Sequence, residues 1–113
     1  MIDSIIIFVT AMDRNLVIRN LDRAFWDIEH DPEGLYKVLH SEVDQSTGID
    51  QNRLFRRLLE TYNWYTVLDM VPAGRLPDLL SPAVTDALRN ASLRKRYNAI
   101  ARILYPATLS ASR

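Results

Sequence analysis

The chain has 113 residues, no cysteine, and 14 basic side chains against 14 acidic ones. Without cysteine it cannot form a disulfide, a thiolate zinc site or a thiol nucleophile, so packing must stabilise it. Hydrophobic residues at 48% and charged residues at 25% exclude wholesale disorder, and the length fits one domain.

The N-terminal residues 1–20 are expected to form a separate apolar arm. Ile5–Thr10 (IIIFVT) is β-branched and favours a short strand, but no later segment is predicted as its partner. A helix continuing through Ile18, a swapped arm and a dimer edge therefore remain as alternatives. The apolar run Ile5–Val9 is too short to span a bilayer and lacks a basic leader, so we expect no targeting segment and a cytoplasmic protein.

Residues 21–106 are predicted to form the helical domain. Asp31-Pro32 is typical of a helix start, and the apolar spacing predicts a helix over 32–44 that buries Val43. Ser46-Thr47-Gly48 should break the chain, and Asp50 should cap the next helix. Asn63 should interrupt that helix before a further one that ends at Pro72-Ala73-Gly74.

The last third opens with a predicted turn around Leu76–Leu80. Ser81-Pro82 predicts a helix over 82–90 with Val84, Ala87 and Leu88 on its buried side, and Ser92 should cap a final helix over 92–105. The helical spacing predicts one apolar stripe on that final helix. Its members are Leu93, Tyr97, Ile100 and Leu104. Residues 107–113 are expected to be a flexible tail.

Charge is divided along the chain. Residues 1–74 hold seven Arg or Lys against twelve Asp or Glu, a net of −5, and residues 75–113 hold seven against two, a net of +5. The acidic residues concentrate in 22–50 and the basic ones in the final helix. The predicted basic binding face consists of Arg89, Arg94, Lys95, Arg96 and Arg102. Separated charge of this kind biases which surfaces meet a partner.

The same helix offers a nucleic-acid alternative. Pro82–Asn90 and Leu93–Tyr105, joined by Ala91-Ser92, could form a helix-turn-helix whose cations neutralise phosphates. Recognition helices usually carry polar base-reading side chains early, however, and this one offers only Asn98 besides its charges. A solvated basic face or a protein-docking face accounts for the same pattern.

The aromatic side chains mostly follow helical spacing, which favours core positions. The members of this set are Phe25, Trp26, Tyr36, Phe55, Tyr62, Trp64, Tyr65 and Tyr97. We expect Trp64 and Tyr65 to mark a protein interface if either one is left exposed.

Three groups of residues could bear on catalysis or metal binding. His30 and His40 lack the i, i+4 spacing of two metal-ligating imidazoles on one helix, which favours surface histidines over a metal site. Arg23 and His30, separated by six residues, resemble the Arg-x(4–6)-His pattern of HEPN-type ribonucleases, although Ala24 stands where that family usually places a polar residue. The alternating carboxylates of 27–33 could serve acid–base catalysis, but near a helix start they have a simpler role, which is to interact favourably with the helix dipole. They are Asp27, Glu29, Asp31 and Glu33.

Two stretches resemble short uncharacterised bacterial helical proteins with a Phe-Trp-Asp signature. They are Leu21–Ile28 (LDRAFWDI) with the later Leu58–Tyr62 (LLETY), and Leu79–Leu104 with its Leu-Leu-Ser-Pro opening and Ser-Leu-Arg-x-Arg-Tyr centre. Such proteins tend to be encoded beside nucleotidyltransferase-type toxins of abortive-infection systems. The resemblance implies a small antitoxin-like or accessory partner and carries over no functional residue.

These observations predict an all-α fold, a small bundle of about five short helices. They favour a non-enzymatic interaction module that binds a protein partner or a second copy of itself. The first alternative is a nucleic-acid-binding protein that uses 92–105, and the second is a HEPN-like ribonuclease. We expect no cofactor, no metal, no small-molecule ligand and no membrane contact.

Overall fold

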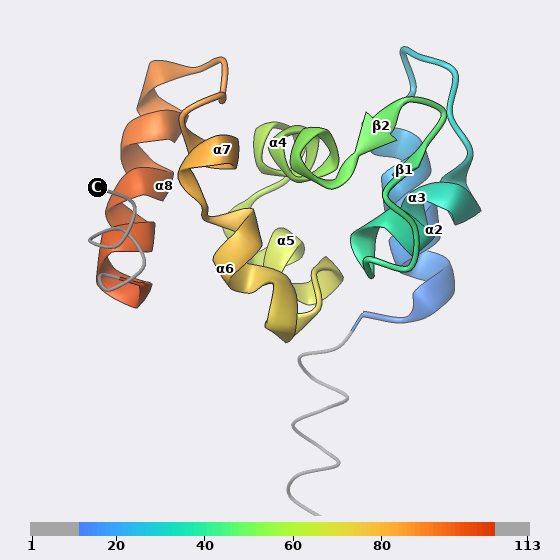
Figure 1. Ribbon diagram of the computed structural model, residues 1–113, viewed down its shortest axis with the longest axis horizontal. Coiled ribbons are helices and arrows are strands. Elements are labelled where there is room, and N and C mark those ends of the chain that lie inside the picture. The colour runs from blue at the N-terminus through green and yellow to red at the C-terminus, as the bar shows by residue number, and fades with distance from the viewer. Residues whose placement is uncertain (1–11, 106–113) are drawn as a thin grey trace, which may run out of the picture.

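The computed structural model describes residues 12–105, which form seven short α-helices and one small hairpin (Figure 1). With 66% of the structure helical, the predicted all-α class is confirmed. Two helices exceed the expected five. α2 (Arg14–Ala24) lies where a helix and an extended arm were the alternatives, and α6 (Leu76–Leu79) lies where a turn was expected. α2 crosses position 20, so residues 14–20 belong to the helical part. The Ile5–Thr10 segment and the tail 107–113 lie outside the described residues.

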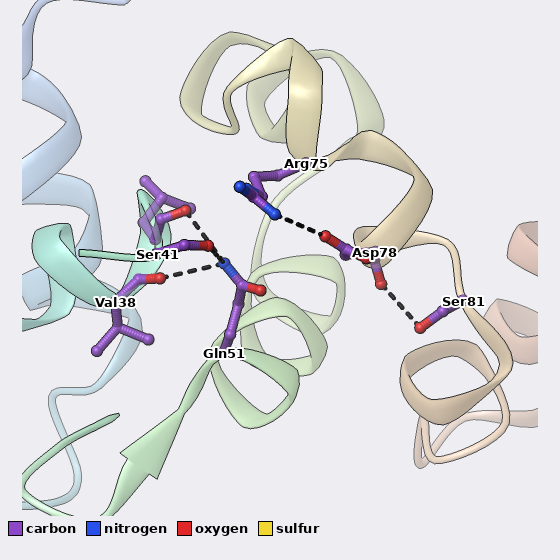
Figure 2. Close-up of polar contacts among 7 residues, drawn as sticks. Val38, Ser41, Gln51, Arg75, Asp78 and Ser81 are labelled. Carbon is purple, nitrogen blue, oxygen red and sulfur yellow. Dashed lines mark hydrogen bonds and ion pairs between the residues drawn. The ribbon is translucent and has the colours of Figure 1, made fainter. Parts of the chain in front are cut away.

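α3 (Pro32–Leu39) starts where predicted but ends five residues early. The side-chain amide of Gln51 donates hydrogen bonds to the Val38 carbonyl (3.1 Å) and to the Ser41 hydroxyl (2.9 Å), as Figure 2 shows. Ser41 itself adopts φ 60°, in the left-handed region, which stops the helix. Val43 is consequently 40% exposed, and its predicted burial is wrong.

A two-stranded hairpin follows, which the sequence analysis did not predict. β1 (Gln45–Ser46) pairs antiparallel with β2 (Ile49–Asp50) through Thr47 (φ 49°) and Gly48 (φ 82°). Positive φ at both loop residues is the type I′ geometry that suits tight hairpins. Gly34 of α3 lets the hairpin approach closely, because a Cβ there would collide with the Ser46 side chain. The turn therefore sets this hairpin, and strand propensity does not.

α4 (Gln51–Thr61) lies at the centre of the fold, with α2 and α3 on one side and α6 and α7 on the other (Figure 1). Its predicted cap is confirmed, since the Asp50 carboxylate accepts a hydrogen bond from the Arg53 amide at 2.8 Å. Four of its side chains are almost completely buried and form the middle of the core. They are Leu54, Phe55, Leu58 and Leu59.

α5 (Trp64–Met70) begins at the predicted interruption. Asn63 is its N-cap and accepts a hydrogen bond from the Thr66 amide at 2.9 Å. After α5 the chain passes Pro72 and continues as a 3₁₀ turn (Ala73–Arg75) into α6. As predicted, Asn63 interrupts the chain before α5, and Pro72 follows the end of that helix.

α7 (Pro82–Thr85) is a single turn, so the predicted helix over 82–90 is wrong in length, and Ala87 is exposed. The Ser81 hydroxyl donates to the Asp78 carbonyl at 2.8 Å and caps no amide of α7 (Figure 2). α7 has no side-chain cap at its start, and the chain after Thr85 forms turns in place of further helix.

α8 (Ala91–Leu104) is the longest described helix and lies at one edge of the molecule, remote from α2 and α3 (Figure 1). Its N-cap is Asn90, whose side-chain oxygen accepts hydrogen bonds from the amides of Ser92 (2.7 Å) and Leu93 (3.2 Å). The predicted cap at Ser92 is therefore wrong by two residues. Along residues 12–105 no helix has the length and apolar character to cross a membrane.

Candidate functional site

α8 is attached to the core along a narrow strip. Tyr97 and Ala101 are almost fully buried, and the Tyr97 ring lies 5.7 Å from that of Trp64 on α5. Leu93 and Ile100 are half-buried, as the predicted stripe requires, but Leu104 is 49% exposed and its predicted burial is wrong. The 14-residue α8 packs mainly on the four-residue α7, which covers only part of its length.

Arg94 serves the fold more than the surface. One guanidinium nitrogen, Nη1, donates hydrogen bonds to the carbonyls of Leu88 and Arg89. The side chain is half-buried and closes the turn between α7 and α8. Charged donors to carbonyls are among the stronger hydrogen bonds in proteins. Arg94 is thus a structural residue in this arrangement.

Arg89 belongs to the basic residues 75–113 and lies beside acidic groups of residues 1–74. Its backbone N–H donates to the Glu60 carboxylate at 2.9 Å, and the residue lines a 320 Å³ hollow with Arg57 and Glu60 of α4. Desolvation opposes ionisation of Asp27, but the hydrogen bond and charge of Arg57, with a further contribution from the Arg89 charge, hold the Asp27 pKa below its usual value. The interactions of Arg89 with Glu60 and Asp27 therefore offset part of the charge difference between residues 1–74 and 75–113.

Lys95, Arg96 and Arg102 remain free. All three side chains are exposed, and within residues 12–105 none of them makes an ion pair or a side-chain hydrogen bond. They occupy positions i−4, i−3 and i+3 around the exposed Ala99, and Ile103, 78% exposed, occupies i+4. We define the outer face of α8 as Lys95, Arg96, Ala99, Arg102 and Ile103. It has a small alanine at its centre, with three cations and one large apolar side chain around it at helical spacing.

Asn98, the one polar residue that sequence reasoning offered as a base reader, points into the protein. Its side-chain oxygen accepts from the buried Thr85 hydroxyl at 2.6 Å, and its amide donates to Asp86 at 3.2 Å. These bonds hold α8 against the α7 segment. With α7 reduced to one turn, residues 82–105 do not form the two helices that a helix-turn-helix requires.

The two aromatic side chains predicted as an interface differ in exposure. Trp64 is half-buried and packs against the core, whereas Tyr65 is 78% exposed. A third aromatic, Trp26, is 80% exposed, although its spacing suggested the core. Burial of Phe25 turns the following residue outward, and no sequence pattern distinguished the two neighbours.

Trp26 lies in a turn that is fixed on both sides. Asp27 pairs with Arg57 (3.1 Å), and the Arg57 guanidinium stacks over the buried Phe25 ring at 5.1 Å. The Ile28 amide donates to the Phe25 carbonyl at 3.2 Å, which closes the turn. The indole is therefore held outward on a rigid support, next to the acidic residues 27–33.

His30 completes that turn. Its Nδ1 lies 2.8 Å from the Ile28 carbonyl, and its Nε2 lies 2.7 Å from the Asp22 carboxylate. Because both partners are acceptors, the doubly protonated ring satisfies both bonds at once. The hydrogen bond to Ile28 is the main cause that raises the His30 pKa, Asp22 and Asp31 add to it, and partial burial opposes it.

This geometry bears on the histidine-based alternatives. Both ring nitrogens of His30 already contact acceptors, which leaves neither one free to exchange a proton with a substrate. His40 instead contacts the Tyr36 ring, 4.4 Å between centroids. Over the described range, 12–105, no three His, Asp or Glu side chains gather as a metal site would need.

In comparisons with known proteins, no family model, no curated protein and no solved structure matches this chain at a significant level. Evidence for the function of this protein therefore comes from its own sequence and geometry.

Proposed function

We propose that the protein is a non-enzymatic interaction module that binds an acidic protein surface through the outer face of α8. The observation that carries this proposal is Ile103, 78% exposed beside Lys95, Arg96 and Arg102, which make no ion pair with any residue of 12–105. A large exposed aliphatic side chain gains free energy only when a partner covers it. The cations would speed association and fix register, while Ile103 and Leu104 would supply apolar contact.

A nucleic-acid ligand is the second candidate, and the free cations Lys95, Arg96 and Arg102 favour it. Phosphate binding has no use for Ile103, however, and Asn98 is occupied within the fold. These two facts favour a protein partner over a nucleic acid. The sequence resemblance gives this function a specific form, an antitoxin-like or accessory protein that binds an acidic surface of a bacterial toxin.

Fluorescence anisotropy with two labelled probes separates the candidates. One probe is a helical peptide rich in Glu and Leu, and the other is a duplex DNA of similar charge. We expect the peptide to bind at about 50 mM salt and to weaken as salt rises. The triple variant Lys95→Glu, Arg96→Glu, Arg102→Glu should weaken it at least about tenfold, and Ile103→Ser should also weaken it, since apolar contact is lost.

The matched control is Arg19→Glu, Lys37→Glu, Arg53→Glu, which changes net charge equally at exposed cations outside α8. If this control weakens the peptide as much as the α8 variant, the proposed site is wrong. If duplex DNA binds more tightly than the peptide and ignores Ile103→Ser, the nucleic-acid candidate replaces the protein one.

A further inference from the structure

We infer that the acidic surface that fits the outer face of α8 is carried by a second copy of this chain, with Trp26 as its anchor. The inference rests on the proposed function and specifies its partner. The chain carries two exposed features of complementary charge, an indole among carboxylates and a small alanine among cations.

The protruding feature is Trp26. An indole that is 80% exposed leaves a large apolar surface in water, and tryptophan is among the residues most enriched at interface hot spots. Its backbone is held by the Asp27–Arg57 pair and by the His30 contacts to Asp22 and Ile28. Because these contacts already order the turn, docking of the indole costs little additional conformational entropy.

The receiving feature is the exposed Ala99 at the centre of the outer face of α8. Lys95, Arg96, Arg102 and Ile103 surround it at helical spacing, and alanine has the smallest side chain among them. A flat ring can therefore approach the helix more closely over Ala99 than over its larger neighbours. Cations at three of the four corners suit an indole in particular, because its ring face attracts positive charge, and Ile103 provides the apolar fourth side.

The charges around the two features are opposite. Glu29 and Asp31 lie within five residues of Trp26, are exposed, and make no ion pair among the described residues. Their charge is opposite to that of Lys95 and Arg102 beside Ala99. The two surfaces cannot meet within one chain as it is folded here, since Trp26 remains exposed. Two copies related by a two-fold axis would satisfy both contacts reciprocally.

Sedimentation velocity on the full chain tests this inference. The wild type should associate to twice its 13.0 kDa mass, more weakly as salt rises, at concentrations up to about 200 µM, as a small interface allows. Trp26→Ala should weaken the association at least about 30-fold. Tyr65→Ala, which removes an equally exposed aromatic from α5, should leave it unchanged.

Charge reversal shows whether the two surfaces pair directly. Glu29→Lys with Asp31→Lys makes one monomeric variant, and Lys95→Glu with Arg102→Glu makes another, because each creates like charges across the contact. Mixed in equal amounts, the two should associate as the wild type does, since every reversed surface then meets its reversed complement. Circular dichroism of each variant checks that it is folded.

A wild type that stays monomeric at low salt overturns the inference, and so does a mixture of the two reversed variants that fails to associate. Neither result touches the proposed function, because the acidic peptide tests the outer face of α8 independently. A peptide that binds to a monomeric wild type would show that the site is correct and that its partner is another protein.

Discussion

His30 has the clearest role of any single side chain, because it joins the end of α2 to the turn that presents Trp26. Its two ring nitrogens bond to the Ile28 carbonyl and the Asp22 carboxylate, and its side chain is only 11% exposed. Both bonds favour the imidazolium, so the folded protein holds this proton more tightly than the unfolded chain does. Stability must therefore depend on pH through this residue.

We expect the stabilisation by His30 to be complete below the ordinary histidine pKa of 6.5 and to be lost as pH rises through the higher folded value. Urea unfolding of the wild type and of His30→Gln at about pH 5.5 and about pH 8.5 measures it. The free-energy difference between the two proteins should be larger at the acidic pH. A difference that grows toward alkaline pH would contradict the assigned bonds, and His40→Gln controls for the loss of an imidazole.

Single residues also mark the limit of sequence-based prediction. The pattern located the cap at Asp50 and the interruption at Asn63, because both signals are local and their residue types are few. It could not identify Trp26 as exposed, because Phe25 and Trp26 are equally apolar and only tertiary packing decides which one enters the core. Arg94 was grouped with the surface cations for a similar reason, since its carbonyl partners lie in a turn that no pattern specified.

At the level of elements, α8 depends on a few attachments. Tyr97 and Ala101 provide its buried strip, Asn98 bonds to Thr85 and Asp86, and Arg94 bonds to the carbonyls of the preceding turn. These attachments lie on one side of the helix, and the outer face is exposed on the other. The predicted apolar stripe was correct at the buried Tyr97 and at the half-buried Leu93 and Ile100, and wrong at Leu104, the last residue of the helix.

Arg94→Met should destabilise the protein by about 1–3 kcal/mol, because it removes a charged donor and leaves carbonyls of the turn without a partner. Lys95→Met, one residue further on but exposed, should change the free energy of unfolding by less than about 0.5 kcal/mol. Urea unfolding followed by circular dichroism measures both. Equal effects for the two variants would contradict the separate roles given to these neighbouring cations.

At the level of the whole molecule, α4 lies between α2 and α3 on one side and the basic α8 on the other (Figure 1). Most of the acidic residues of 22–50 lie in the segments 27–33 and 42–50, at the start of α3 and after its end. The separation of acidic from basic residues is partial, since Arg57, Glu60 and Arg89 connect the two groups along one side. Among the described residues, the cations of the outer face of α8 have no ion-pair partner. The sequence predicted the all-α class and the opposed charges, because both depend on composition and periodicity. Which cations stay free depends on tertiary contacts, which periodicity does not report.

Nuclear magnetic resonance of the ¹⁵N-labelled protein, titrated with the Glu- and Leu-rich peptide, tests the central claim most directly. If the outer face of α8 is the interaction surface, the largest amide shift changes should fall on Lys95, Ala99 and Ile103. Amides around Tyr65, equally accessible on α5, should change little. Changes that centre on α5, or that spread evenly over the molecule while α8 stays silent, would contradict the claim.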